Sequence, residues 1–382
     1  MISYGRQHIT EDDIEVVTAV LRSDWLTQGP TIEHFEKALC QHVQSEHAVA
    51  MNSATSALHV ACVALGLSPG DHLWTSPITF LASAYAGLYC GANVDFVDVE
   101  PQTGNMSVSA LSQKLIEAER DGALPKIVVP VHFTGRPCDM APIRELSRRY
   151  GFFIVADAAH AIGAQYAEEF VGSNDHADIT IFSFHPVKII TTIEGGAAMT
   201  KDAALAARMR RLRSHGVVRD PSEMVDVPDG PWSYQAVELG WNYRMTDVQA
   251  ALGLSQLKRL NYYVEKRTEL AARYSHLLRE TGLMLPPVDT QEVSAWHLYV
   301  VGWNEKISGI SRRHAFERMR ASGIGVQVHY SPVHLQPIFR TRGFQEGHFP
   351  NAEAFYSTAL TLPLHGTLTY DQQDTVIAAL PF

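Results

Sequence analysis

Thr180-Ile-Phe-Ser-Phe-His-Pro-Val-Lys188-Ile-Ile-Thr-Thr-Ile-Glu-Gly195-Gly196 is the stretch that decides the fold. Residues 180–184 have the apolar, β-branched character of a buried strand. Pro186 must end that strand, because proline has no backbone N–H to donate to a central sheet. Lys188 follows at the rim of the predicted sheet. The two glycines then permit a close backbone approach before the next apolar run.

The position of Lys188 suggests a nucleophilic amine. An amine at the end of a buried strand is partly desolvated, which lowers its pKa and favours its neutral form. Such a lysine can bind an aldehyde cofactor as a Schiff base. The alternative is an ordinary loop lysine in solvent, and Lys188 taken by itself leaves both interpretations open.

The segment around Lys188 resembles the lysine segment of the DegT/StrS-type sugar aminotransferases. The shared pattern is Ser183-Phe-His-Pro-Val-Lys188 followed by Glu194-Gly195-Gly196. Members of this family are fold-type I enzymes that use pyridoxal 5′-phosphate (PLP). The resemblance implies an α/β fold with a mostly parallel central sheet in a large PLP-binding domain, and a smaller C-terminal α+β domain. Ile193 departs from the family pattern, which has a small residue, often Gly, at that position.

The composition is that of a globular enzyme or binding protein. The 382 residues suffice for two domains with a large core, and 46% of them are hydrophobic. The net charge of −10 argues against a nucleic-acid-binding surface. No apolar run reaches the roughly 20 residues of a membrane span, and the N-terminus lacks the layout of a signal peptide. The four cysteines are scattered without a zinc-binding pair, so we expect a cytoplasmic protein with reduced thiols and no metal site.

Hydroxyl residues follow the first predicted buried strand, residues 47–51, at the start of a helix. This stretch reads Asn52-Ser-Ala-Thr-Ser-Ala-Leu58. Free N–H groups at the start of a helix bind anions, which favours a phosphate site. Simple N-capping by Ser53 or Thr55 is the alternative, and a single such stretch favours it. The family resemblance favours the phosphate site, because fold-type I enzymes have their phosphate loop at this position.

An acidic residue ends another predicted strand. Asp157 follows the apolar run 152–156, where a buried carboxylate is costly unless a cation pairs with it. A protonated pyridine nitrogen is such a cation, and PLP needs an acid there to act as an electron sink. Capping of the next helix is the alternative, and Asp157 by itself leaves both open. Lys188 lies 31 positions after Asp157, which matches the family spacing.

Strands and helices alternate along the rest of the chain. Further apolar strands are predicted at 73–76, 94–99 and 126–132. Alternation with helical patterns predicts parallel strands joined by crossover helices. We expect a large domain at 1–255 and a small domain at 256–382, the latter with strands at 295–301 and 325–329. Residues 217–233 lack periodicity and predict a surface loop, followed by a long helix that reaches about residue 280 with a break near 261.

The resemblance implies a role for each residue that matches a family motif. Lys188 is the catalytic residue, which binds the cofactor and then moves a proton between cofactor and sugar. Asp157 pairs with the pyridinium nitrogen, Phe80 stacks on the ring, and His160 lies near the phenolic oxygen. The phosphate is bound by Thr55, Ser56, Ser183 and, from the neighbouring subunit, Asn242. Candidates for the nucleotide-sugar site are Tyr4, Trp25, Leu26, Thr27, Ala54, Ser183, Asn242, His329 and Tyr330.

The resemblance covers essentially the whole chain and is closest to the branch that acts in pseudaminic acid synthesis. It implies that L-glutamate gives its amino group to PLP, which passes it to C4 of a UDP-linked 4-keto-6-deoxy-N-acetylhexosamine. The product would be UDP-4-amino-4,6-dideoxy-N-acetyl-β-L-altrosamine, and the shared site implies a homodimer.

Three alternatives stay open. One is another nucleotide-sugar aminotransferase, of the perosamine or 4-amino-arabinose type. The second is a dehydratase or deoxygenase on the same fold, although such relatives have histidine in place of the lysine. The third is a non-catalytic regulatory or binding protein, which would not need Lys188 and Asp157 together.

Overall fold

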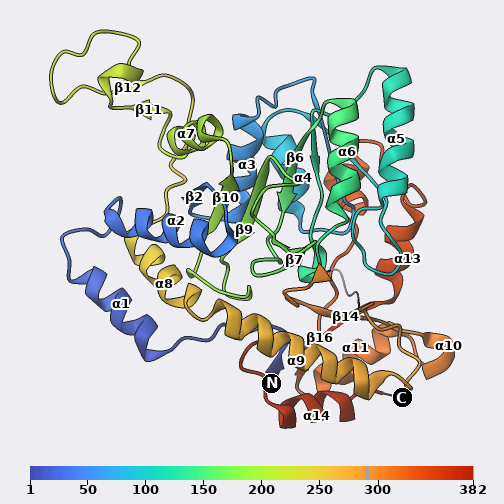
Figure 1. The fold of residues 1–382 in the computed structure, drawn as a ribbon. Coiled ribbons are helices and arrows are strands. Elements are labelled where there is room, and N and C mark those ends of the chain that lie inside the picture. Colours follow the sequence, from blue (N-terminus) through green and yellow to red (C-terminus); the bar gives the residue numbers. More distant parts are fainter. Residues whose placement is uncertain (289–291, 382) are drawn as a thin grey trace.

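The computed structural model describes residues 1–288 and 292–381, and its fold centres on one sheet (Figure 1). The seven strands of this sheet lie in the order β2-β10-β9-β6-β5-β3-β4. Their bounds are β2 (His47–Met51), β3 (His72–Thr75), β4 (Asn93–Phe96), β5 (Ile127–Val129), β6 (Phe153–Asp157), β9 (Ile179–Ser183) and β10 (Gly196–Thr200). Neighbouring strands are parallel except where β10 meets β2 and β9. The predicted α/β fold with a mostly parallel central sheet is confirmed.

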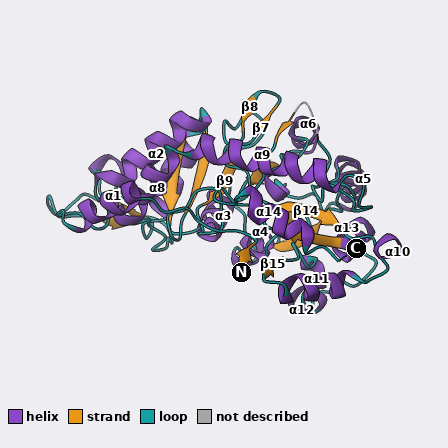
Figure 2. Cartoon of the chain, turned by 90° about the horizontal axis from the view of Figure 1, so that it is seen from below, coloured by secondary structure: helices purple, strands orange, loops and turns teal. Residues whose placement is uncertain are grey.

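Helices cover both faces of the sheet, because the side chains of each strand alternate between the faces. In β2, Val49 and Met51 pack into one core, and Ala48 and Ala50 pack into another. Figure 2 shows α2 on one side of the strands and α3 on the other. The helices of this part of the chain are α1 (Glu11–Leu21), α2 (Pro30–Val43), α3 (Ala54–Ala64), α4 (Leu81–Tyr89), α5 (Val108–Asp121), α6 (Met140–Tyr150), α7 (Ala203–Leu212) and α8 (Asp247–Leu257).

Local sequence explains where helices begin and end. Thr10 caps α1, and its backbone N–H donates a hydrogen bond to Asp13 Oδ2 at 2.9 Å. Pro30 begins α2, because the fixed φ of proline suits the first helical residue. The predicted long helix is divided into α8 and α9 (Leu260–Leu278), and the break at 258–259 precedes the predicted position by a few residues.

The C-terminal elements pack around a separate core, which includes Leu270, Tyr299 and Leu362. The strands β14 (Tyr299–Gly302) and β16 (Ala359–Leu362) are antiparallel, and β15 (Ile324–Gly325) is parallel to β1 (Ile2–Ser3). The prediction of a strand at 325–329 is therefore wrong in length, because beyond Gly325 the chain makes an isolated bridge from Gln327 to Thr361. The helices here are α10 (Glu305–Ser308), α11 (Arg312–Ala321), α12 (Pro337–Arg340), α13 (Pro350–Thr358) and α14 (Tyr370–Ala378).

The predicted domains 1–255 and 256–382 stay a prediction. Their boundary falls within the last turn of α8. A small sheet joins β13 (Glu292–Val293), after this boundary, to the hairpin β7 (Gln165–Tyr166) and β8 (Glu169–Phe170), before it. Of the helices in the described ranges, none has both the length and the apolar composition needed to cross a membrane.

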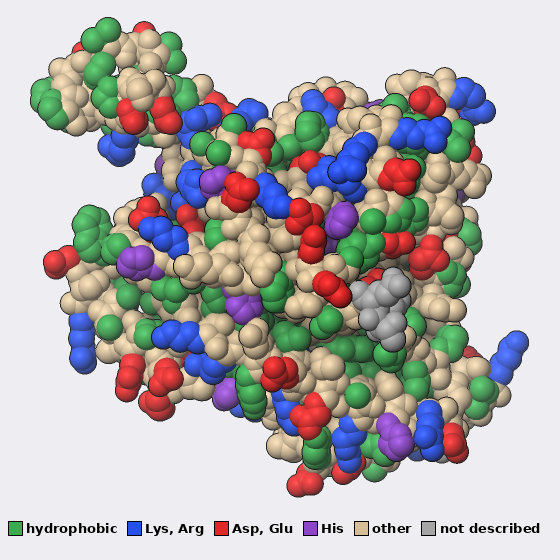
Figure 3. Space-filling view, in the orientation of Figure 1, with side chains coloured by type: hydrophobic (Ala, Val, Ile, Leu, Met, Phe, Trp, Pro, Cys, Tyr) green, Lys and Arg blue, Asp and Glu red, His purple; other side chains and the backbone are tan. Residues whose placement is uncertain are grey.

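Residues 216–240, called the arm below, project from the body of the molecule (Figure 1). They contain a two-stranded ribbon, in which β11 (Val217–Val218) pairs with β12 (Gln235–Ala236), and a 3₁₀ turn at Pro221–Glu223. The loop predicted at 217–233 is thus partly ordered into a ribbon. Figure 3 shows hydrophobic side chains gathered on this projection.

Candidate active site

A cavity of about 440 Å³ lies at the carboxyl ends of β6 and β9. Parallel strands end at the same edge of a sheet, which brings together residues that follow different strands. The cavity is lined by most of the predicted site residues, namely Tyr4, Ala54, Thr55, Phe80, Asp157, His160, Ser183, Lys188, His329 and Tyr330.

The loop from Phe184 to Gly196, called the lysine loop below, is closed by its own backbone. The Phe184 N–H donates to the Gly195 carbonyl at 2.9 Å, and the Thr192 N–H donates to the Phe184 carbonyl at 3.0 Å. The Lys188 N–H donates to the His185 carbonyl at 2.9 Å, which makes a turn. These bonds direct Lys188 to the cavity at a strand end, as the sequence predicted.

Gly196 allows the start of α3 to approach β10. A Cβ atom at Gly196 would lie 2.4 Å from the Ala54 nitrogen, closer than real Cβ contacts. The predicted close backbone approach is confirmed here, and it places the N-terminus of α3 at the cavity wall. Ser53 caps this helix by accepting a hydrogen bond from the Ser56 N–H at 3.1 Å.

The electrostatics of the cavity raise the neutral fraction of Lys188. Burial lowers the pKa of Lys188 to about 8, because it disfavours the ammonium form, and the nearby Asp157 carboxylate partly opposes this shift. Burial raises the pKa of Asp157, opposed by a hydrogen bond from the Ser83 hydroxyl at 2.6 Å and one from the Ala159 N–H at 3.0 Å. About a tenth of Lys188 is therefore neutral at pH 7, far more than for an exposed lysine.

His160 lies deep in the cavity wall with limited hydrogen bonding. Its Nε2 lies 3.3 Å from the Tyr330 hydroxyl oxygen, and its buried Nδ1 has no partner among the described residues. Burial lowers the pKa of His160 well below its ordinary value, and repulsion from the ammonium form of Lys188 acts in the same direction. A neutral His160 next to Lys188 leaves a free ring nitrogen for a bound group.

Five predicted site residues do not line this cavity within the described part of the chain: Ser56, Trp25, Leu26, Thr27 and Asn242. The Ser56 hydroxyl donates to Asn52 Oδ1 at 2.6 Å. Trp25 and Leu26 have 57% and 48% of their surface exposed, and Thr27 forms a bridge to Thr246 at the start of α8. Asn242 is exposed and forms a bridge to Ser214. The roles given to these residues stay predictions.

The sequence did not reveal three residues that shape the site. Ser83 donates to Asp157, and Thr79 lies within 2.7 Å of Ser83, oxygen to oxygen. Ser83 lies three residues after Phe80, one helical turn along α4, so helical spacing from Phe80 is the signal that would have found it. His297 contacts His160 with ring centroids 4.4 Å apart, and a pattern in the sequence gives no hint of that contact.

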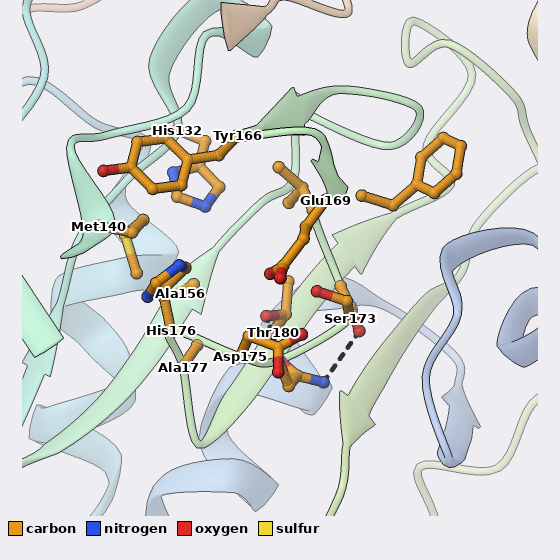
Figure 4. Close-up of a pocket in the computed structure, with 14 residues that line it drawn as sticks. His132, Met140, Ala156, Tyr166, Glu169, Ser173, Asp175, His176, Ala177 and Thr180 are labelled. Atoms are coloured by element: carbon orange, nitrogen blue, oxygen red, sulfur yellow. Dashed lines mark hydrogen bonds between the residues drawn. The ribbon is translucent and has the colours of Figure 1, made fainter. Parts of the chain in front are cut away.

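A second cavity lies under the β7–β8 hairpin, lined by His132, Tyr166, Glu169 and His176 among others (Figure 4). Its volume of about 40 Å³ holds a few water molecules. It is too small for an aldehyde cofactor, and Lys188 does not line it.

The large cavity fits PLP in its chemistry. The neutral fraction of Lys188 suits a carbonyl carbon, the buried Asp157 suits a pyridinium nitrogen, and the start of α3 suits a phosphate. Phe80 is an aromatic residue with 60% of its surface exposed at the cavity wall, where a flat ring can stack on it. The fold and this cavity define an enzyme of the PLP-dependent fold-type I class.

The chain belongs to the DegT/DnrJ/EryC1/StrS aminotransferase family, whose model matches residues 7–381. It is 37% identical to the spore coat polysaccharide biosynthesis protein SpsC of Bacillus subtilis, over 99% of this chain and 96% of SpsC. It is 38% identical to the UDP-4-amino-4,6-dideoxy-N-acetyl-β-L-altrosamine transaminase of Campylobacter jejuni, over 96% of this chain and 93% of that protein. The solved structure of Helicobacter pylori PseC superposes with a TM-score of 0.89 at 29% identity and covers 99% of both chains.

Aminotransferases of this family use PLP. The protein is therefore a PLP-dependent aminotransferase, as the sequence predicted.

Proposed function

We propose that this protein transfers the amino group of L-glutamate to C4 of a UDP-linked 4-keto-6-deoxy-N-acetylhexosamine, giving UDP-4-amino-4,6-dideoxy-N-acetyl-β-L-altrosamine. The observation that carries this proposal is the 38% identity to the altrosamine transaminase along nearly the full length of both chains. The cavity supports it with an aromatic and histidine wall formed by Tyr4, His329 and Tyr330, opposite the start of α3. Such a wall suits a sugar ring, which stacks on apolar faces and accepts hydrogen bonds at its edge.

Each of the main cavity residues has a separate role in the proposed reaction. Lys188 Nζ would hold the cofactor through its carbonyl group between turnovers, and the same amine would carry a proton to and from the substrate carbon. The carboxylate of Asp157 accepts hydrogen bonds from Ser83 and the Ala159 N–H, and in this position it would keep the pyridine nitrogen of the cofactor protonated. When bound, PLP supplies an electron sink for the carbon that bears the transferred nitrogen. The start of α3, with Thr55, holds the phosphate.

We propose further that the active form is a homodimer with shared sites. Asn242 is exposed and lies outside the cavity of its own chain, so its proposed contact with a cofactor phosphate requires a second copy. The exposed Trp25 and Leu26 and the apolar arm are the surfaces that a second copy would cover. Trp25, Leu26 and Thr27 would then join the nucleotide-sugar site from beside that interface.

An amination assay against a panel of nucleotide sugars tests the proposed substrate. The purified, PLP-loaded protein is incubated with L-glutamate and each of several 4-keto sugar nucleotides, including UDP-linked N-acetyl and GDP-linked sugars, and product formation is followed by mass spectrometry. We expect the UDP-linked 4-keto-6-deoxy-N-acetylhexosamine to give the highest kcat/KM. A preference for the GDP-linked precursor of perosamine or for the UDP-linked precursor of 4-amino-arabinose would overturn the proposed substrate.

A further inference from the structure

His59 on α3 contacts both residues that flank Asn242 in the chain. Its ring centroid lies 4.5 Å from that of Trp241 and 6.0 Å from that of Tyr243. Its Nδ1 lies 3.3 Å from the Tyr243 hydroxyl oxygen. The Trp241 and Tyr243 rings stack on each other, with an angle of 13° between their planes. The histidine is 5% exposed, so the three rings form one packed cluster.

This cluster sets the direction of the Asn242 side chain. The segment is extended, because Asn242 forms an antiparallel bridge to Ser214 and Arg244 forms one to Met51. Side chains two positions apart on an extended segment point to the same side, and the residue between them points to the other. Trp241 and Tyr243 point to α3, so the exposed Asn242 points away from that helix, and it does not line its own chain's cavity.

The same helix also forms the phosphate end of its own chain's cavity. His59 lies four residues after Thr55 and three after Ser56, on one face of α3. The Ser56 hydroxyl donates to Asn52 Oδ1, and the Asn52 N–H donates to the Tyr243 carbonyl at 2.9 Å. One turn of α3 therefore connects the cavity of one subunit with the segment that carries Asn242.

We propose that His59 is a positioning residue that acts on the cofactor of the partner subunit through Asn242. This inference rests on the proposed shared site. The His59 ring supports the stacked pair, and the pair holds the backbone from which Asn242 extends. Without the ring, Asn242 loses its fixed direction and the phosphate of the neighbouring cofactor loses a donor. One helix then serves both sites of the dimer, its own through its first turn and the other through His59.

Two heterodimers with the same substitutions in different arrangements test the inference. In the first, one chain carries Lys188→Ala and the other carries His59→Leu, so the single site with a lysine receives Asn242 from a chain with intact His59. In the second, one chain carries both substitutions and the other is wild type, so the single site receives Asn242 from the His59→Leu chain. Different affinity tags on the two chains allow each heterodimer to be purified, and PLP dissociation is followed by absorbance.

We expect the first heterodimer to retain PLP like a wild-type site. The second should retain it about threefold to tenfold less tightly, like the His59→Leu homodimer. Equal retention in the two arrangements overturns the inference. Weaker retention in the first arrangement also overturns it, because His59 would then act on its own subunit's cavity. His59→Phe, which keeps a ring against Trp241 and Tyr243, should restore most of the retention, and it replaces His59→Leu as the partner variant if the latter does not fold.

The same two arrangements with Asn242→Ala separate this inference from the proposed shared site. If Asn242→Ala weakens PLP retention in the second arrangement alone and His59→Leu does not, the shared site stands and the inference about His59 fails. If Asn242→Ala shows no difference between the arrangements, the shared site itself fails, and the inference fails with it.

Discussion

The lysine loop and the arm both lack long regular elements, but they differ in what stabilises them. The lysine loop is bonded to its own backbone, and its Ile189 and Ile190 are buried. The arm is attached mainly at its base, where Glu238 pairs with Arg208 and Arg211 on α7. Its apolar side chains remain exposed, with exposed fractions of 80% for Val225, 91% for Val227, 75% for Trp232 and 81% for Leu239 (Figure 3).

This difference indicates how the site is built. The half that contains Lys188 and Asp157 is held by contacts within a single chain, namely the backbone bonds of the lysine loop and the hydrogen bonds from Ser83 and Ala159 to Asp157. The half that would contain Asn242 lies beside an exposed apolar projection, and such surfaces mark interaction sites. We infer that folding of one chain positions Lys188 and Asp157, and that association of two chains completes the cofactor-binding site by adding Asn242.

Of the substitutions that test this difference, replacing Lys188 should have the largest effect. We expect Lys188→Ala to lower turnover by about 10³-fold or more while the fold is retained, because one amine is both nucleophile and proton carrier. Turnover by the PLP-loaded protein and circular dichroism provide the measurements. Lys201→Ala is the control, since Lys201 pairs with Asp175 outside the cavity. Full activity of Lys188→Ala would show that the lysine loop is not the catalytic half.

Asp157→Asn tests the other member of the single-chain half. We expect the variant to keep PLP weakly and to lose about a hundredfold in kcat, because a neutral amide does not stabilise a protonated pyridine nitrogen. Asp95→Asn is the matched control, because that carboxylate pairs with Lys114 away from the cavity. A loss of less than about tenfold, ~1.4 kcal/mol of transition-state stabilisation, would show that Asp157 is not this partner.

Asn242→Ala tests the half that depends on a second chain. Loss of one donor to a phosphate should weaken PLP binding about tenfold to a hundredfold, ~1.5–3 kcal/mol, without disrupting the dimer. Equilibrium dialysis measures the PLP affinity, and analytical ultracentrifugation measures the fraction of the protein that is dimeric. Mixing this variant with Lys188→Ala should restore activity in heterodimers that have one wild-type site. Activity no higher than in the two parent variants, with subunit exchange confirmed, argues that each chain builds its site without the other.

The lowered pKa of Lys188 predicts a pH dependence of cofactor binding. In the protein freed of PLP, the rate constant for PLP binding should rise about tenfold from pH 7 to pH 9 and level off above pH 9, since the neutral amine forms as the pH passes a pKa of about 8. Asp157→Asn should shift this curve to lower pH, because it removes the charge that stabilises the ammonium form. The ionisation of free PLP also changes with pH, but it affects the measurements on both proteins equally. Identical pH dependences for the wild type and Asp157→Asn would show that the charge of Asp157 does not raise the pKa of Lys188.

Ile193 offers a smaller test, within the lysine loop itself. Its φ of 71° lies in the left-handed region, which costs a non-glycine residue about 1–2 kcal/mol. Ile193→Gly releases this strain against about 0.5–1 kcal/mol of added chain entropy in the unfolded state, so we expect the free energy of unfolding to rise by about 0.5–1 kcal/mol. Denaturant unfolding measures it. Ile116→Gly is the control, because Ile116 is equally exposed at 57% but lies within α5, where glycine should lower the free energy of unfolding by about 0.5 kcal/mol. A lower stability of Ile193→Gly would show that Ile193 is not strained.

The chemical residues at strand ends were predictable because their signals are local. Lys188 and Asp157 each follow an apolar run with a clear end, and parallel strands bring such ends to one edge. The strand at 47–51 was predicted with the observed bounds for the same reason. The ribbon in the arm was missed, because its strands are two residues long and carry no periodicity.

The sequence by itself determined the fold class and, through its family resemblance, the cofactor, because short patterns of buried strands, glycines and charged residues carry both. It also predicted Lys188 and Asp157 as the residues that act on that cofactor. The tertiary structure decided which side chains support those residues. The bond from Ser83 to Asp157 and the contact of His59 with Trp241 join positions that are 74 and 182 residues apart in the chain. A periodic pattern describes neighbours along one element, whereas such contacts exist because packing of separate elements brings their faces together.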